Sequence, residues 1–156
     1  MATYTDTIGY YRGIAAMTAA LGRLVWLEVE IDLQTVIAAR TAAGATALAA
    51  ADTLQCLPLK KGLLILQGGI NVTEAELTNT TGTYSLGFLG GSPAAANVFA
   101  SAVANNAVAN NAVGLAAPLL LTADDTLDVL FNTAVGTNGV FTVWVVGIDT
   151  TAAYQP

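Results

Sequence analysis

The chain contains no histidine, which removes the commonest general base, the commonest ligand for transition metals and the usual pH-sensitive side chain. Ser-His-Asp triads, Cys-His pairs and zinc sites that require histidine are therefore excluded. The single cysteine, Cys56, cannot close an intramolecular disulfide or supply a four-cysteine zinc site. The strand-like run around Cys56 favours an inert, half-buried thiol over a nucleophile without a base. The use of a single cysteine indicates a reducing compartment.

Charged side chains are scarce as well, making up 10% of the 156 residues where soluble domains average about 25%. Five Lys and Arg residues stand against 11 Asp and Glu residues, so the formal net charge is −6. Nucleic-acid binding needs clustered basic residues, which this acidic chain lacks. The 54% of hydrophobic residues and the mean hydropathy of +0.61 predict an apolar surface that contacts protein, and hence a homo-oligomer.

Long apolar runs are also missing. The longest uncharged stretch lies between Glu76 and Asp124, and it is interrupted by glycines, two prolines and, from Asn97 to Asn111, five asparagines. No window offers the ~20 consecutive apolar residues of a membrane-spanning helix, so we expect no membrane segment. The apolar residues 14–21 are followed at once by Gly22 and Arg23, a pattern that argues against a secretory signal.

What is present is a series of short strand patterns. Residues 24–33 alternate strictly, with apolar side chains on one face and Trp26 and three carboxylates on the other, which indicates a half-buried antiparallel strand. Further strand-like runs cover residues 53–57, 63–72, 84–89, 118–122, 126–132 and 140–149. Pro58 and the turn at residues 60–62 separate the first two of these runs. This spacing, with no long amphipathic helix, predicts an all-β fold: a jelly-roll-like antiparallel β-sandwich with an N-terminal arm or short helix.

The alternation also predicts which side chains fill the space between the two sheets. The expected core residues are Val25, Leu27, Val29, Ile31, Leu64, Leu66, Ile70, Leu86, Phe88, Leu127, Val129, Phe131, Phe141, Val143, Val145 and Ile148.

The N-terminal segment differs from the rest of the chain. We divide the sequence into an arm at residues 1–22 and a sandwich domain at residues 23–156. The arm's aromatic and apolar side chains lie outside the alternating pattern, so we expect them to contact a sister subunit or another protein. The candidate interface residues are Tyr4, Tyr10, Tyr11, Ile14, Met17 and Leu21. The alternative is that the arm folds back on its own sandwich as an edge strand or a helix.

Two low-complexity stretches carry weaker signals. Residues 38–51 are rich in alanine, but Gly44 and the threonines argue against a helix there. The motif Val-Ala-Asn-Asn-Ala at residues 103–107 is repeated at residues 108–112. A period of five fits neither strand nor helix, which favours a duplicated loop at the rim of the sandwich. A short helix with a polar stripe and an exposed contact loop remain open.

Two groups of carboxylates resemble functional sites only superficially. Glu28 and Glu30 are expected to lie roughly 6.5–7 Å apart, a separation seen in inverting glycosidases. They continue into Asp32 as one stripe, however, which is typical of a solvated or subunit-facing polar strip.

Asp124, Asp125 and Asp128 offer oxygen ligands of the kind that calcium prefers. Their spacing is not that of an EF-hand, and Asp residues commonly stabilise turns by bonding the backbone. The glycines of residues 87–92 lack the Lys-Ser/Thr of a phosphate-binding loop. We therefore expect no catalytic residues, no cofactor and no metal site, and a protein that is not an enzyme.

A chain of turn and strand motifs within residues 24–150 resembles a known family. The motifs are residues 57–62 leading into 63–73, then 82–87, 121–127 and 140–149. They are similar to the head decoration, or capsid cement, proteins of tailed bacteriophages, which have a jelly-roll-type sandwich. The resemblance implies a virion protein on the outer capsid surface, made in the host cytoplasm. Its partner would be the major capsid protein, and it would act as a trimer that clamps neighbouring coat subunits, without nucleic-acid or membrane contacts.

Two other functions remain open at this stage. The chain could be a tail, fibre or host-binding jelly-roll component of a virion. Less in keeping with the motifs, it could be a non-viral ligand-binding β-sandwich.

Overall fold

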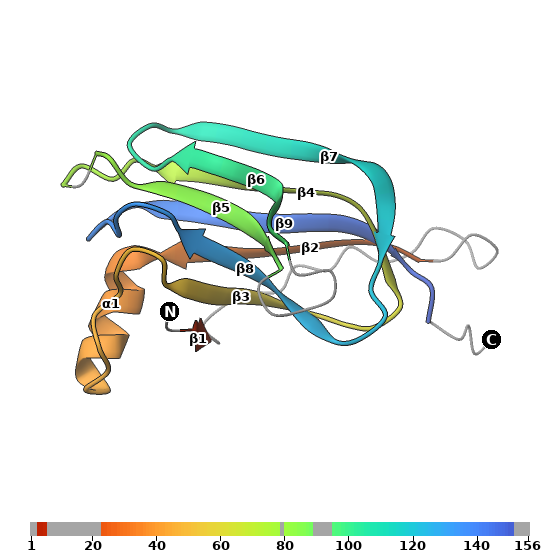
Figure 1. Ribbon diagram of the computed structural model, residues 1–156, viewed down its shortest axis with the longest axis horizontal. Coiled ribbons are helices and arrows are strands. Elements are labelled where there is room, and N and C mark those ends of the chain that lie inside the picture. The colour runs from red at the N-terminus through yellow and green to blue at the C-terminus, as the bar shows by residue number, and fades with distance from the viewer. Residues whose placement is uncertain (1–2, 6–22, 79, 89–94, 152–156) are drawn as a thin grey trace.

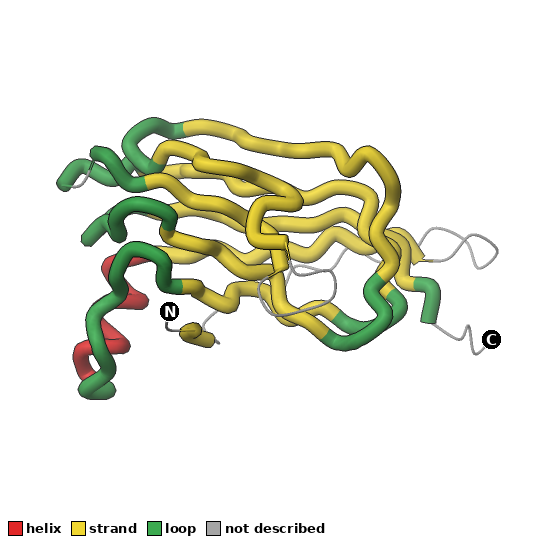
Figure 2. The backbone as a smooth tube through the Cα atoms, in the orientation of Figure 1, coloured by secondary structure: helices red, strands yellow, loops and turns green. Residues whose placement is uncertain are grey.

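The structure is a computed structural model that describes residues 3–5, 23–78, 80–88 and 95–151. Two β-sheets pack face to face, and one helix extends from one end of the sandwich (Figures 1 and 2). The elements are β1 (Thr3–Thr5), β2 (Arg23–Asp32), α1 (Leu33–Ala42), β3 (Thr53–Leu59), β4 (Leu63–Glu74), β5 (Thr83–Phe88), β6 (Ala95–Ala104), β7 (Ala109–Leu120), β8 (Asp125–Phe131) and β9 (Val140–Asp149).

The strand order is that of a jelly roll. One sheet has the order β2-β9-β4-β7 and the other has the order β1-β3-β8-β5-β6. From β2 onward the antiparallel pairs are nested, because β2 pairs with β9, β3 with β8, β4 with β7, and β5 with β6. This is the pairing of a jelly roll, so the predicted fold class is confirmed. β1 adds a short parallel strand beside β3.

β2 follows the predicted alternation, but the chain after it differs from prediction. Val29 and Ile31 are 2% exposed, whereas Glu30 on the opposite face is exposed. Asp32 ends the strand and caps α1, its side chain accepting hydrogen bonds from the backbone N–H groups of Gln34 at 2.9 Å and Thr35 at 3.4 Å. Leu33, expected as the last strand residue, instead begins the helix. The helix extends to Ala42, so the prediction against a helix in residues 38–51 was wrong for the first residues of that stretch.

The core fills the space between the sheets, and an aromatic cluster joins them. The Tyr84 ring of β5 lies 4.9 Å from Phe141 of β9, in the other sheet, and 5.6 Å from Phe131 of β8. Most predicted core residues are buried. Five are only partly buried: Val25, Leu27, Leu64, Leu66 and Ile148. Leu64 and Leu66 differ from prediction because the register of β4 shifts between Ile65 and Gln67, so Leu63 and Ile65 face the core instead.

The segment with the duplicated motif forms two long strands that the sequence did not predict. The first copy ends β6 and turns, and the second begins β7. Asn105 is fixed in this turn by two backbone hydrogen bonds, one from its N–H to the carbonyl of Gly82 and one to its carbonyl from the N–H of Glu76. The motif therefore ends an edge strand of one sheet, turns and begins an edge strand of the other sheet, rather than forming a loop insertion.

Pro58 was expected to separate two strands, yet it lies within β3 opposite Thr126. The missing N–H of Pro58 costs little here, because β1 pairs only with residues 53–55 and a register shift precedes Pro58. The turn at residues 60–62 does separate β3 from β4, and Gly62 makes it possible with a φ of +85°.

Candidate interaction surfaces

The outer face of the β2-β9-β4-β7 sheet carries a row of apolar side chains that crosses all four strands. Leu24 lies opposite Ile148, Ile148 opposite Leu64, and Leu64 opposite Leu120. Leu24 is 41% exposed and Leu120 is 48% exposed. Cross-strand neighbours share one face of a sheet, so these four residues form a continuous strip, which we call the apolar row. Contiguous exposed apolar surface of this kind marks protein contacts.

A tryptophan pair continues this surface beyond the apolar row. The rings of Trp26 and Trp144 stack with their centroids 4.9 Å apart and an interplanar angle of 8°. Trp144 lies so close over Gly69 that a Cβ atom on this glycine would stand 2.8 Å from the ring. Gly69 therefore lets the indole lie flat on the sheet. The exposed indole of Trp26 donates to Glu28 at 2.9 Å, which holds it in place as part of the outer surface.

Sequence reasoning missed the apolar row, although a signal for it was present. Leu64 and Ile148 were assigned to the core. In residues 140–149 the core-facing Val143 and Val145 alternate with Trp144, Val146 and Ile148, so both faces of this strand are apolar. Such a run indicates either a strand buried on both sides or a sheet face that another protein covers.

The predicted carboxylate stripe on β2 is not one functional unit. Glu28 bonds the indole of Trp26 and Asp32 caps α1, while Glu30 points outward. Glu28 and Asp32 therefore bond to their own neighbours on the chain and Glu30 is exposed, as expected of a polar stripe.

The three aspartates of the predicted turn point in different directions. Asp124 accepts hydrogen bonds from the Lys60 ammonium at 2.7 Å and from the Lys61 backbone at 2.9 Å, and the Lys60 bond holds the pKa of this carboxyl below its usual value. Asp128 is fully buried and accepts from the Thr126 hydroxyl at 2.6 Å. Within the described ranges no group of three or more metal-ligating side chains comes together.

Cys56 and the glycine-rich segment complete the residues singled out by sequence. Cys56 is 4% exposed, more buried than expected, and its thiol donates to the Leu54 carbonyl at 3.3 Å. Gly87 pairs with Asp128 inside β5, whereas residues 89–94 lie outside the described residues. α1 is shorter and less apolar than a membrane-crossing helix would be, and the described residues contain no helix that meets that requirement.

Of the six candidate interface residues in the arm, Tyr4 is in β1, where its backbone pairs with Leu54. The other five, Tyr10, Tyr11, Ile14, Met17 and Leu21, lie outside the described residues. The arm as an interface thus stays a prediction.

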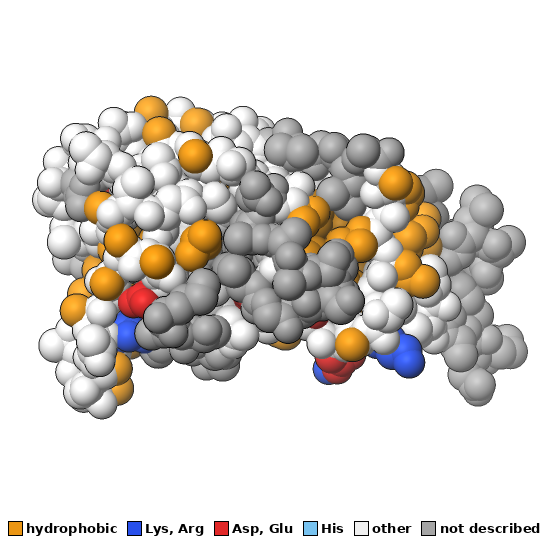
Figure 3. Space-filling view, in the orientation of Figure 1, with side chains coloured by type: hydrophobic (Ala, Val, Ile, Leu, Met, Phe, Trp, Pro, Cys, Tyr) orange, Lys and Arg blue, Asp and Glu red, His pale blue; other side chains and the backbone are white. Residues whose placement is uncertain are grey.

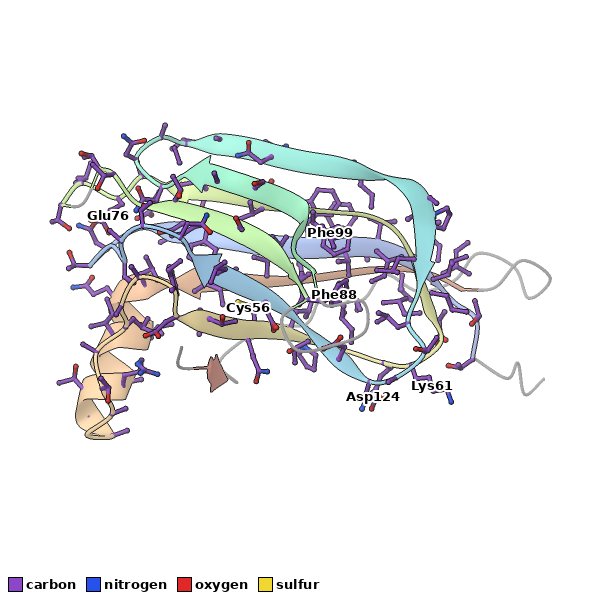
Figure 4. The ribbon with its side chains drawn as sticks, viewed as in Figure 1. Cys56, Lys61, Glu76, Phe88, Phe99 and Asp124 are labelled. Atoms are coloured by element: carbon purple, nitrogen blue, oxygen red, sulfur yellow. The ribbon has the colours of Figure 1, made fainter. Side chains whose placement is uncertain are left out.

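A buried polar cluster lies at the opposite end of the sandwich from Asp124 (Figure 4). Glu76, from the connection between β4 and β5, is 1% exposed and lies near the Tyr84 hydroxyl. Burial raises the pKa of Tyr84 to about 12; the Asn105 side chain opposes this shift, and the charge of Glu76 adds to it.

This shift predicts a loss of stability in alkali. The pKa of Tyr84 is near 10 in the unfolded chain, so the folded state holds the phenol proton more tightly. The stabilisation of the fold that comes from this difference is complete below pH 10. It should disappear as the pH rises to about 12, a loss of about 3 kcal/mol. Urea titrations of the wild type and Tyr84→Phe at several pH values measure the difference. A difference that stays constant from pH 8 to 12 would contradict the prediction.

Chains of two solved structures have a fold similar to this one. No protein-family model and no curated protein sequence matches the chain. A chain of the acidic stable capsid structure of Helicobacter pylori bacteriophage KHP30 matches with a TM-score of 0.55 and 13% identity, over 89% of this chain and 93% of that one. A chain of the cyanophage Pam1 capsid asymmetric unit matches with a TM-score of 0.55 and 15% identity, over 86% and 91% of the two chains. The likeness shows a shared fold over nearly the whole length.

Proposed function

We propose that this chain is a non-enzymatic structural component of a phage capsid, and more specifically a decoration or cement protein. In this role it binds the outer head lattice and bridges neighbouring coat subunits. The observation that carries the proposal is the near full-length likeness to chains of two phage capsid structures. The exposed apolar row and Trp26 supply contact area for protein partners. The net charge of −6 suits the outside of the shell better than contact with packaged DNA.

The experiment that tests this function is electron cryomicroscopy of intact particles of the phage that encodes the chain. A cement protein gives density on the outer head surface at hundreds of copies. A handful of copies at the tail or on a fibre would favour the alternative virion role and would overturn the proposal.

We further propose that the protein is a trimer held in place by the arm at residues 1–22. Tyrosine side chains provide large contact area with few rotatable bonds, so they suit an interface anchor. Light scattering at micromolar concentration should then give about three times the 15.8 kDa mass of one chain. A single species of 15.8 kDa would count against the trimer.

Deleting residues 2–21 tests the role of the arm. The truncated chain loses β1, which pairs only with residues 53–55 at a sheet edge, so we expect the sandwich to stay folded. It should lose the trimer or its binding to capsids. If the truncated chain unfolds, the arm belongs to the fold of its own subunit and the interface role is wrong.

A further inference from the structure

A groove opens between β2 and β3 on one side of the sandwich. It lies at the end that holds Lys61 and Asp124 (Figure 4), where hydrophobic side chains also reach the surface (Figure 3). Its volume is about 280 Å³, and its lining includes Val25, Leu27, Pro58, Leu63, Lys60 and Lys61. We call it the seam groove. Pockets for small ligands generally occupy ~300–1,000 Å³, so this one suits one or two side chains of a protein partner.

The floor of the groove is apolar and incompletely covered. Val25 and Leu27 lie on the core-facing side of β2, yet both remain half-buried, while Val29 and Ile31 further along the strand are 2% exposed. The sandwich thus leaves apolar contacts unmade at this end. Filling this space with an apolar side chain from outside would remove the exposed part of Val25 and Leu27 from water.

The β2 backbone beside the groove is an open sheet edge. β2 is the terminal strand of its sheet, and within the described residues its only strand partner is β9. On an edge strand, alternate residues direct their N–H and C=O groups away from the sheet, where an added strand can bind them. Strand addition to such an edge supplies affinity through the main chain and specificity through side-chain pockets next to it.

Two lysines stand at the rim of the groove, in a chain that is otherwise acidic. Lys60 and Lys61 are two of only five basic residues. Lys60 pairs with Asp124 at 2.7 Å, whereas the Lys61 ammonium forms no ion pair with any described residue. Asp149 also borders the groove, but its carboxylate accepts hydrogen bonds from the N–H and hydroxyl groups of Thr151, both at 2.9 Å. Lys61 is therefore the lysine at the rim that has no ion pair among the described residues, and its ammonium favours a carboxylate of the partner.

We propose that the seam groove binds an extended, carboxylate-bearing segment of a neighbouring capsid protein. The segment adds to the free edge of β2, places an apolar side chain against Val25 and Leu27, and sets its carboxylate beside Lys61. This inference rests on the proposed capsid function, and it assigns the partner contact to a site separate from the apolar row and the arm.

Binding to capsids of the encoding phage, prepared without this protein, tests the groove by co-sedimentation. Lys61→Glu should lower the apparent affinity at least tenfold, because it replaces attraction for the carboxylate by repulsion. The matched control is the double variant Gln34→Glu and Ala38→Glu, which changes the net charge equally on exposed positions of α1 and should bind like the wild type. Leu27→Asp should weaken binding as well, with Val108→Asp, at a 71% exposed position, as its control.

The outcomes separate the groove from the proposed function. If the wild type does not bind capsids at all, the cement function is wrong. If the wild type binds and Lys61→Glu binds equally well, the groove proposal is wrong while the function stands.

Hydrogen exchange of the β2 amides that point away from β9 identifies the occupant. We expect these outward-directed amides to become protected only in the capsid-bound protein. Protection already present in the free protein would assign the edge to a second copy or to the chain's own residues, and would overturn the choice of partner.

Discussion

Replacing Phe141 with alanine should lower the free energy of unfolding by about 4 kcal/mol, the largest effect that we expect from a single substitution. Phe141 is 1% exposed and contacts Tyr84 across the sandwich, so the substitution opens a cavity between the two sheets. For a chain of this size, the midpoint of thermal unfolding should fall by roughly 8–16 °C.

The control for Phe141→Ala is Thr142→Ala, the next residue along β9, which lies on the outer face. Urea titration of both variants measures the effect, and a constant slope of free energy against urea shows that only stability has changed. If the two variants unfold at the same urea concentration, the aromatic cluster does not hold the sheets together.

The parts of the fold that the sequence predicted best are strands whose own residues carry a clear pattern. β2 is the best example, because charged residues alternate with Val29 and Ile31 and leave one possible orientation. The boundaries of β9 were predicted as Val140–Asp149, and the structure gives the same residues. In both strands a local pattern and the tertiary environment agree, so the pattern suffices.

Where the prediction failed, the deciding contact lies elsewhere in the chain. β6 and β7 are rich in alanine and asparagine, which have low strand propensity. They become strands because β6 pairs with β5 and β7 pairs with β4. The shift that buries Ile65 rather than Leu66 is a β-bulge, which leaves no periodic signal. α1 begins at a capping aspartate, Asp32, that also fitted the alternation of the preceding strand.

The candidate surfaces were less predictable than the fold for a related reason. The apolar row and the seam groove each combine residues from strands that are distant in sequence, such as Leu24 with Leu120 and Val25 with Lys61. Only the nested pairing of the jelly roll brings them together. Sequence composition predicted that apolar surface must be present, and topology decides where it lies.

The loops at one end of the sandwich depend on Glu76. One oxygen of its carboxylate accepts from the Thr78 N–H at 2.7 Å and from the Thr78 hydroxyl, and the other accepts from the Asn138 N–H at 2.8 Å. The backbone N–H of Glu76 bonds the Asn105 carbonyl. A single buried side chain thus joins the connection between β4 and β5 to that between β8 and β9, next to the turn after β6.

We therefore expect Glu76→Ala to lower the free energy of unfolding by about 3 kcal/mol, because the two part-buried backbone N–H groups of Thr78 and Asn138 lose their charged acceptor. Glu76→Gln keeps the shape of the side chain and one acceptor oxygen, so it should lower the free energy of unfolding by about half as much as Glu76→Ala. Gly136→Ala should act through the same contact, since a Cβ atom there would lie 1.8 Å from a Glu76 carboxylate oxygen and would displace it. Glu74→Ala, at an exposed carboxylate two residues earlier, is the matched control. Urea titration ranks the four variants. Equal midpoints for Glu76→Ala and Glu74→Ala would show that the Glu76 carboxylate does not hold the loops. If it does hold them, hydrogen exchange at the Thr78 and Asn138 amides should rise in Glu76→Ala and not in Glu74→Ala.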